Sequence, residues 1–174
     1  GYYNVQLVVT SDQGCKDTTT KRIQVYPMPS AYFPLPDSKC LLNNFYQFSS
    51  QSTAVTPATI QSNIWDFGDG INGVSGPQVS HVYLNDGNIK VKLVSTSTDN
   101  CVDSVTQIFQ IYPMPKADFT VPPVACFLNN NYLFTSSSSI ITIQNPLVAG
   151  RIDSCFWNFG GTPRDTFGFS VRHQ

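Results

Sequence analysis

Charged residues are scarce in this sequence. Asp, Glu, Lys and Arg make up 12% of its 174 residues, a low share for a soluble protein, and they leave a net charge of only −1. A chain this neutral lacks the basic surface that attracts nucleic acid or anionic membranes. No apolar run approaches the roughly 18–20 residues of a membrane-spanning helix. We therefore expect neither a nucleic-acid partner nor a membrane span.

The short motifs of common catalytic sites are also missing. The sequence contains no G-x-S-x-G, no H-E-x-x-H, no P-loop and no C-x-x-C. It has no Asn-x-Ser/Thr sequon, and no signal peptide opens it. Because it begins in the middle of a strand pattern, we expect it to be a piece of a longer chain. The missing motifs predict a protein that is not an enzyme and that needs no organic cofactor.

Aromatic residues are plentiful at 13%, and Ser, Thr, Asn and Gln supply most of the polar side chains. This composition is typical of secreted β-rich modules. The central stretch is residues 64–70. Trp65 and Phe67 stand two residues apart, so a strand would point both side chains to one face and Asp66 to the other. Asp69-Gly70 is a turn signal, so the stretch predicts an inward-facing strand that runs into a tight turn.

The chain repeats itself. Cys101 follows Cys15 by 101 − 15 = 86 residues, and the second Tyr-Pro-Met-Pro, at 112–115, follows the first by the same distance. The tryptophans and the histidines are instead 157 − 65 = 92 and 173 − 81 = 92 residues apart. The last copy therefore carries 92 − 86 = 6 extra residues, which we place in a loop within 136–150. Further pairs at a spacing of 86 are Cys40 and Cys126, Asn43-Asn44 and Asn129-Asn130, Phe48 and Phe134.

These spacings predict three modules. Residues 1–27 would be the C-terminal strands of a first, partial module, residues 28–113 a complete module, and residues 114–174 the N-terminal part of a third. Both junctions are Pro-Met-Pro. Two prolines in three residues force extended backbone and leave little freedom. We therefore expect the modules to be joined stiffly, end to end, so that neighbouring repeats are partners of one another.

Alternation of apolar and polar residues predicts strands, and no segment shows a helical period. Six short strands are expected in the complete module. Six strands in a module of this length, with turns between them, predict an all-β fold of the Ig-like β-sandwich type. The residues expected to face inward are Ala31 and Phe33, Tyr46 and Phe48, Trp65 and Phe67, Val79, His81 and Tyr83, Ile89, Val91 and Leu93, Phe109 and Ile111.

The complete module carries a motif that resembles the signature of the PKD domain. That signature is a W-x-F-G-D-G strand and turn, then an H-x-Y strand, then a G-x-x-x-V-x-L strand. The resemblance implies tandem Ig-like sandwiches of the PKD type. The residues that match, in order, are Trp65, Asp66, Phe67, Gly68, Asp69, Gly70, Pro77, His81, Tyr83, Gly87, Val91 and Leu93.

The partial copies match the same signature incompletely. The first copy has only its closing part, in Gly1, Val5 and Leu7. The third has Trp157 and Phe159. It departs from the pattern at the turn, where Asn158 stands for Asp66 and Gly161 stands for Asp69.

Tandem PKD copies with paired cysteines and a Gly-Cys or Asn-Cys turn are similar to the giant surface adhesins of gliding Bacteroidetes, of the SprB type. That resemblance implies export by type IX secretion, an extracellular place at the cell surface, and a role in adhesion or gliding motility. The implied partners are extracellular polysaccharide or other surface proteins. The alternative is a spacer or support module of a secreted hydrolase. A third interpretation is direct carbohydrate binding by exposed aromatics such as Tyr32 or Tyr112.

The histidines and carboxylates favour a structural role. His81 and His173 occupy equivalent positions, and a catalytic histidine is rarely duplicated once per repeat, so we expect hydrogen bonds within the sheet. Asp66 and Asp69 would be the ligands of a calcium ion, but calcium needs several converging oxygens and only these two carboxylates are at hand. A turn role for Asp69 is the simpler interpretation.

Four of the five cysteines form repeat-equivalent pairs, one member before the second strand of a module and one in its last hairpin. In an oxidising compartment, a bridge from Cys40 to Cys101 within the module is the simplest interpretation. The rival is a bridge to a neighbouring module, since an Ig-like topology puts the first loop and the last hairpin at opposite ends. Cys155 stands at the position of Asn63, and we expect its partner beyond residue 174. The five are Cys15, Cys40, Cys101, Cys126 and Cys155.

One short motif recurs at the start of the last strand. Asp17-Thr18-Thr19 and Asp103-Ser104-Val105 lie 86 residues apart. They resemble the O-glycan acceptor of exported Bacteroidetes proteins, which makes Thr18 and Ser104 candidates for glycosylation. The other interpretation is an exposed strand start, where Asp and Thr are common.

Overall fold

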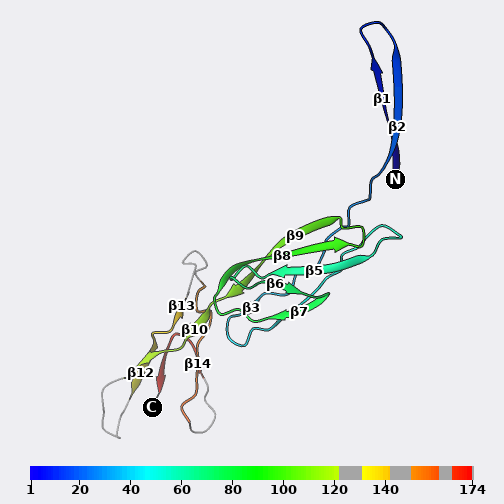
Figure 1. Ribbon diagram of the computed structural model, residues 1–174. Coiled ribbons are helices and arrows are strands. Elements are labelled where there is room, and N and C mark those ends of the chain that lie inside the picture. The colour runs from blue at the N-terminus through cyan, green and yellow to red at the C-terminus, as the bar shows by residue number, and fades with distance from the viewer. Residues whose placement is uncertain (122–130, 142–149, 161–165, 174) are drawn as a thin grey trace. The chain divides into compact units, whose positions relative to one another are not determined.

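The fold is described from a computed structural model, which covers residues 1–121, 131–141, 150–160 and 166–173 (Figure 1). These residues form strands, turns and extended segments, and none of them lies in a helix that could cross a membrane. The strands are β1 (Tyr2–Thr10), β2 (Lys16–Gln24), β3 (Lys39–Cys40), β4 (Tyr46–Ser49), β5 (Ile60–Asp66), β6 (Asn72–Ser75), β7 (Gln78–His81), β8 (Gly87–Ser97), β9 (Val102–Tyr112), β10 (Met114–Lys116), β11 (Phe119–Thr120), β12 (Tyr132–Ser136), β13 (Ser139–Ile141), β14 (Phe156–Trp157), β15 (Thr166–Phe167) and β16 (Ser170–His173).

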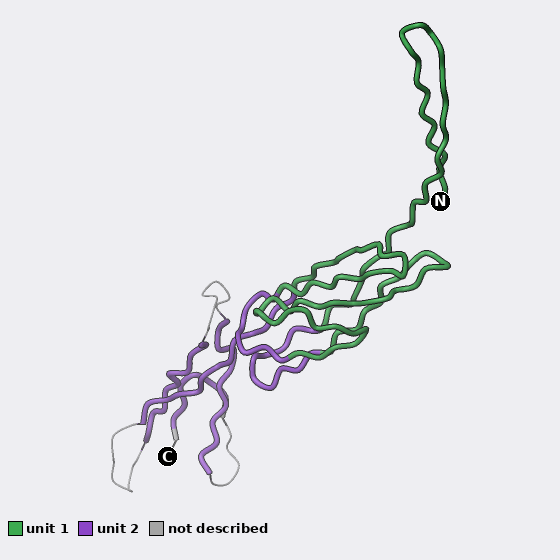
Figure 2. The backbone as a smooth tube through the Cα atoms, viewed as in Figure 1, with its two compact units in different colours: residues 1–36, 47–81, 90–108 green, residues 37–46, 82–89, 109–174 purple. Residues whose placement is uncertain are grey.

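The residues group into two compact units, coloured separately in Figure 2. Strands β8 and β9 have residues in both. Each unit has its own cluster of buried aromatic rings. The first unit comprises residues 1–36, 47–81 and 90–108, and the second comprises residues 37–46, 82–89 and 109–174.

Two sheets build the complete sandwich. One has five strands in the order β3-β9-β8-β5-β6, and the other pairs β4 with β7. Strand β5 is antiparallel to both β6 and β8, whereas β3 runs parallel to β9. Phe48 of β4 packs on Trp65 of β5 with ring centroids 5.8 Å apart, so the two sheets meet face to face. The all-β, Ig-like sandwich expected from the sequence is confirmed.

Strand β8 shows why the sequence pattern forms this fold. Ile89, Val91 and Leu93 are 9%, 0% and 0% exposed, while Lys90 and Lys92 between them face solvent. A strict period of two puts every second side chain into the core. At about 25 cal/mol per Å² of buried apolar surface, each fully buried aliphatic side chain contributes roughly 1.5–3 kcal/mol.

The strand predicted at residues 31–33 is not formed, although Ala31 and Phe33 are buried as expected, at 9% and 0% exposure. Side chains take two N–H groups of this segment, whereas the Tyr32 carbonyl accepts from the Gln51 N–H at 2.8 Å. The Ala31 N–H donates to Asp103 Oδ2 at 2.8 Å, and the Tyr32 N–H donates to Ser52 Oγ at 3.1 Å. The segment is therefore extended without belonging to a ladder.

Two parts of the chain lie outside the two sheets of this sandwich. Strands β1 and β2 form a two-stranded antiparallel hairpin, from Tyr2 opposite Gln24 to Thr10 opposite Lys16, and every residue of it is exposed. The described residues between 114 and 173 form three small sheets, in the orders β10-β13, β11-β12-β16 and β14-β15.

Candidate functional site

The buried tryptophan strand is the centre of the complete sandwich. Trp65, at the end of β5, is 0% exposed, and its indole N–H donates to the Gly76 carbonyl at 2.9 Å. Phe33 meets its ring edge-on, with centroids 5.1 Å apart. A buried indole N–H needs such a partner, because an unpaired one would cost about 1–3 kcal/mol. The polar end of Trp65 thereby holds the loop after β6 against the core.

A tight turn follows this strand, and the two predicted turn carboxylates build it. Asp66 Oδ1 accepts a hydrogen bond from the Gly68 N–H at 2.9 Å, and Asp69 Oδ1 accepts one from the Ile71 N–H at 3.1 Å. Gly68 has φ +76°, and a Cβ atom there would lie 2.2 Å from the Lys90 carbonyl oxygen. Only glycine fits where β8 passes this closely.

His81 completes the turn region. Its Nε2 lies 2.6 Å from Asp69 Oδ2, and its ring stacks on Phe67 with centroids 4.2 Å apart and planes 1° from parallel. The pair joins the end of β7 to the turn after β5. Among the described residues, no three His, Cys, Asp or Glu side chains group as a metal site would require.

The sequence analysis missed a network of serine hydroxyls under the sheet. Ser95 of β8 is 0% exposed and donates to Asn63 Oδ1 at 2.9 Å. Ser50 donates to the same oxygen at 2.8 Å, and Ser52 Oγ lies 2.8 Å from Ser95 Oγ. The network links β8, β5 and the segment after β4. A signal was present, since Ser50 and Ser52 recur 86 residues later as Ser136 and Ser138.

A second aromatic cluster occupies the other unit. The Tyr46 ring meets the Tyr83 and Phe109 rings at centroid distances of 5.7 Å and 4.9 Å. Asn44 binds the backbone of Tyr83 in this cluster through two hydrogen bonds. Its side chain accepts from the Tyr83 N–H at 2.8 Å and donates to the Tyr83 carbonyl at 2.7 Å. Burial raises the pKa of the Tyr46 hydroxyl above its ordinary value, because water no longer solvates the phenolate.

The cysteine geometry bears on the two predicted bridges. Cys15, Cys40, Cys101 and Cys155 are free thiols, and Cys126 lies outside the described residues. Cys40 stands opposite Tyr112, at the end of β9, whereas Cys101 immediately precedes the start of β9. The 112 − 101 = 11 residues between these positions span about 36 Å along a strand. A disulfide needs Cα atoms within about 7 Å, so the bridge Cys40–Cys101 is not formed.

The remaining predicted positions are surface ones. Thr18 lies on β2 and Ser104 on β9, and both side chains are exposed. Tyr32 and Tyr112 are 49% and 45% exposed. The His173 side chain and Gly161 lie outside the described residues.

The contacts of Trp65 recur around Trp157. The Trp157 indole donates to the Gly168 carbonyl at 2.7 Å, and the Gly160 N–H donates to Asn158 Oδ1 at 2.8 Å, as the Gly68 N–H does to Asp66. Asn158 therefore performs the turn role of the aspartate it replaces.

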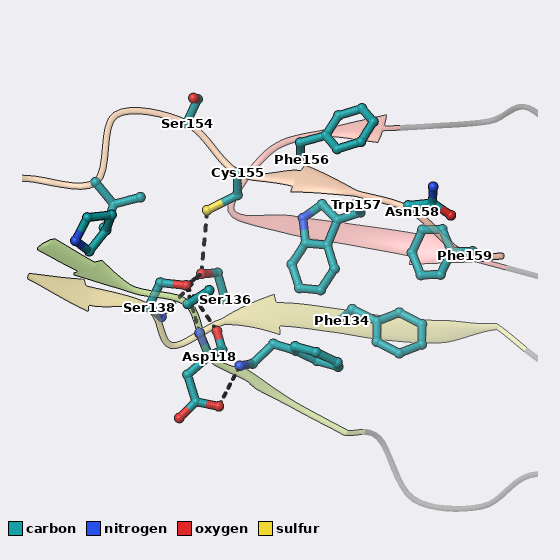
Figure 3. Close-up of a pocket in the computed structure, with 14 residues that line it drawn as sticks. Asp118, Phe134, Ser136, Ser138, Ser154, Cys155, Phe156, Trp157, Asn158 and Phe159 are labelled. Carbon is teal, nitrogen blue, oxygen red and sulfur yellow. Dashed lines mark hydrogen bonds between the residues drawn. The ribbon is translucent and has the colours of Figure 1, made fainter. Parts of the chain in front are cut away.

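The packing around Trp157 is open, however. A cavity of about 530 Å³ lies beside it, and Figure 3 shows Trp157, Phe134 and Phe159 gathered at this cavity. At the other end of the cavity, Cys155 Sγ lies 3.4 Å from Ser136 Oγ. In the complete sandwich, Asn63 stands at the position of Cys155 and accepts a hydrogen bond from Ser50, the counterpart of Ser136.

Comparison with known proteins finds one family whose model matches the complete sandwich. The model of the PKD domain family matches residues 29–112. The PKD1 domain of Vibrio anguillarum Epp is 24% identical, with a TM-score of 0.44 over 50% of this chain and 96% of that one. The PKD1 domain of the Vibrio cholerae metalloprotease PrtV is 24% identical, with a TM-score of 0.43 over 49% of this chain and 98% of that one.

A structure of carbohydrate-binding modules from the β-sandwich superfamily is 21% identical, with a TM-score of 0.47 over 63% of this chain and 48% of that one. The family match spans the tryptophan strand, the glycine turn and the serine network. Residues 29–112 of this chain thus match the PKD domain family, as the sequence motif led us to expect.

Proposed function

We propose that the chain is a non-enzymatic repeat segment of a secreted cell-surface adhesin. PKD sandwiches joined end to end would supply extended reach and mechanical stability for surface attachment or gliding motility. The modules would be residues 1–27, 28–113 and 114–174, the first and last of them partial. PKD domains are structural modules of surface and secreted proteins, which supports an extracellular location.

This proposal rests on a set of stabilising contacts that recurs along the chain. The indole-to-glycine bond, the Asx turn and the serine pair recur at shifts of 92 or 86 residues. These contacts hold a sandwich together and offer no nucleophile or acid–base pair to a substrate. Repetition of a stabilising framework is the arrangement that a load-bearing array requires.

The strand arrangement suits a load applied at the two ends of the complete module. Strand β3 near the N-terminal side pairs in parallel with β9 at the C-terminal side, through Lys39 opposite Ile111 and Cys40 opposite Tyr112. Pulling the ends apart would slide these parallel strands past each other. Sliding loads the hydrogen bonds of this short ladder together, whereas peeling breaks them singly, so we expect this pairing to resist force.

The cysteines and acceptor serines fit the same role. The placement of Cys40 and Cys101 at opposite ends of β9 supports bridges between neighbouring modules, formed by the thiol oxidation machinery of an extracytoplasmic compartment. Exposed Thr18 and Ser104 would carry O-glycans. The bound surface would be polysaccharide or another surface protein.

Single-molecule force spectroscopy of the chain tests the mechanical role. Unfolding of residues 29–112, 84 residues in all, should release up to roughly 290 Å of chain in one step. Substituting Ile111→Pro, which removes the N–H from β9, should lower the unfolding force, and Lys21→Pro in the separate hairpin should not. Gradual extension without a step would contradict the proposal.

Adhesion is tested on the same material. Beads that carry the chain should be retained on polysaccharide-coated glass, and the chain should leave chitin and casein uncleaved. Hydrolysis of either polymer would contradict the non-enzymatic role. A catalytic domain in the same polypeptide, with no retention of the beads, would favour the spacer of a secreted hydrolase instead.

A further inference from the structure

The sequence contains a single asparagine that is followed by glycine, Asn72-Gly73. This pair opens β6, which is the edge of the five-stranded sheet among the described strands, and both residues are exposed. The carboxamide of an asparagine can react with the backbone nitrogen of the next residue, and glycine leaves that nitrogen uncrowded because it has no Cβ. Asn72 therefore combines a reactive dipeptide with access to water.

The pairing of β6 interrupts the ladder at the nitrogen that would react. Trp65 stands opposite Val74 and Asp66 opposite Asn72, so Gly73 is the extra residue of a β-bulge and faces no residue of β5. Its φ of +74° is one that glycine adopts without strain. No atom of the described residues lies within 4 Å of the position of its Cβ. The site therefore has the room that rearrangement of this peptide unit needs.

Other asparagines of the sandwich are held or hindered. The side chains of Asn44 and Asn63 are engaged in hydrogen bonds within the fold. Asn88 lies within β8 and precedes Ile89, whose branched side chain crowds the nitrogen. The Asn72 carboxamide makes no hydrogen bond with any described residue. Of these four asparagines, Asn72 is the one whose carboxamide is both unrestrained and next to an uncrowded nitrogen.

The fold does not depend on this dipeptide. In the last copy of the module, Arg164-Asp165 stands 92 residues after Asn72-Gly73. The bond from the tryptophan indole to a glycine carbonyl is nevertheless present in both copies. Position 72 can therefore be substituted in a test without removing a contact of the core.

We propose that Asn72 is a site of spontaneous deamidation, which converts it to aspartate or isoaspartate as the folded chain ages. The Gly73 nitrogen attacks Asn72 Cγ and forms a C–N bond. The bond from Cγ to Nδ2 breaks, and Nδ2 leaves as ammonia with the proton that Gly73 loses. Water then opens the resulting succinimide at either carbonyl, and one of the two products carries the backbone through the former side chain. This inference is independent of the adhesin role, because it concerns the covalent chemistry of the chain itself.

Both products weaken the pairing of β6. Position 72 faces Asp66, so the new carboxylate places two like charges directly opposite each other. Isoaspartate also adds one methylene group to the backbone, which disturbs the register of the residues that follow. Gly76, whose carbonyl accepts from the Trp65 indole, comes directly after this strand. Deamidation at the edge therefore acts on the loop that contacts the core tryptophan.

Peptide mapping of the whole chain after prolonged storage in neutral buffer tests the proposal. The peptide that contains position 72 should yield two more acidic products, and an isoaspartyl methyltransferase should label one of them. Asn88 is the internal reference and should stay intact. The same chain unfolded in guanidinium chloride shows the rate without the fold. An Asn72 that stays intact in the folded chain, while the unfolded chain converts it, would overturn the proposal.

Two substitutions at the site test the cyclic step. Asn72→Gln keeps an amide but must close a larger ring, so both products should be lost. Gly73→Ala places a methyl group beside the attacking nitrogen and should slow the conversion about tenfold, which corresponds to about 1.4 kcal/mol in the barrier. Equal rates for the wild-type and Gly73→Ala chains would show that water attacks the carboxamide directly, and would overturn the proposal.

Thermal unfolding tests the effect on β6. Anion exchange separates the aged chain by its additional negative charge, and its melting temperature should lie below that of the fresh chain. Asn72→Asp should reproduce the part of this shift that the charge causes. Asn72→Arg, the residue of the last copy, puts a cation opposite Asp66 and should cause no such loss. An aged fraction that melts at the temperature of the fresh chain would overturn the inferred weakening of β6.

Discussion

The complete sandwich and residues 114–173 have the same local contacts but not the same burial. The two indoles donate to glycine carbonyls at 2.9 Å and 2.7 Å, and the two Asx turns close at 2.9 Å and 2.8 Å. Phe33, however, is 0% exposed and Phe119 is 49% exposed. Short-range sequence therefore determines the turns and the hydroxyl pairs, and the strands β8 and β9 supply the burial.

The largest expected difference between the two regions concerns their tryptophans. Trp65→Ala should lower the free energy of unfolding of the complete sandwich by about 3–5 kcal/mol, because it leaves a cavity beside Phe33 and Phe48. Trp157→Ala should leave the free energy of unfolding of the complete sandwich unchanged, since Trp157 packs in another part of the chain. Urea denaturation followed by circular dichroism measures both, and equal losses would refute the comparison.

The two turn glycines sharpen the comparison. Gly68→Ala should cost about 2–4 kcal/mol, since its Cβ would lie 2.2 Å from the Lys90 carbonyl oxygen at a φ of +76°. Gly160→Ala should cost only about 1 kcal/mol from its φ of +74°, because no atom of the described residues lies within 4 Å of its Cβ position. Thermal unfolding of the complete sandwich should shift for Gly68→Ala and stay unchanged for Gly160→Ala, because the cost at Gly160 falls on residues outside that sandwich.

The buried serine network offers a smaller test. Ser95→Val should destabilise the sandwich by about 1–3 kcal/mol, because it removes the hydroxyl that donates to Asn63 and contacts Ser52. Adding Asn63→Cys, the residue that the last copy has at this position, should recover part of the loss, because it removes the amide oxygen left without its Ser95 donor. If the double variant lost more free energy of unfolding than the two single variants together, this prediction would be contradicted.

Ionisation of Tyr46 should produce the mildest effect. The pKa of its hydroxyl is raised in the folded state, so the folded chain resists losing this proton. Stability should be constant with respect to this group below the ordinary tyrosine pKa, about 10. It should fall as pH rises above that value, because the unfolded chain then releases the proton more readily. Tyr46→Phe should flatten this slope between pH 9 and 11, whereas exposed Tyr32→Phe should not.

The sequence was sufficient for most of the fold, because burial follows a period of two in Trp65, Phe67, Val91 and Leu93. It failed where the backbone bonds to side chains. Residues 31–33 alternate like a strand, yet Asp103 and Ser52 take the N–H groups that a ladder would use. Strand β6 was missed because Asn72 and Gly73 are typical of turns, and only its pairing with β5 defines it.

The site was less accessible to sequence reasoning. The turn roles of Asp66 and Asp69 follow from local chemistry, so they were within reach. Contacts between distant segments, such as that of Ser95 with Asn63, depend on which strands become neighbours. A serine spacing can suggest such a contact but cannot supply its geometry.

Cys40 and Cys101 allow the length of β9 to be measured in the folded domain. Their sulfur atoms mark the two ends of β9, in a strand whose length is fixed while the sandwich is folded. With the other thiols replaced by serine, a donor dye on one and an acceptor on the other would report that length by energy transfer. A loss of the energy-transfer signal under load or in denaturant would then report unfolding of the domain in single molecules.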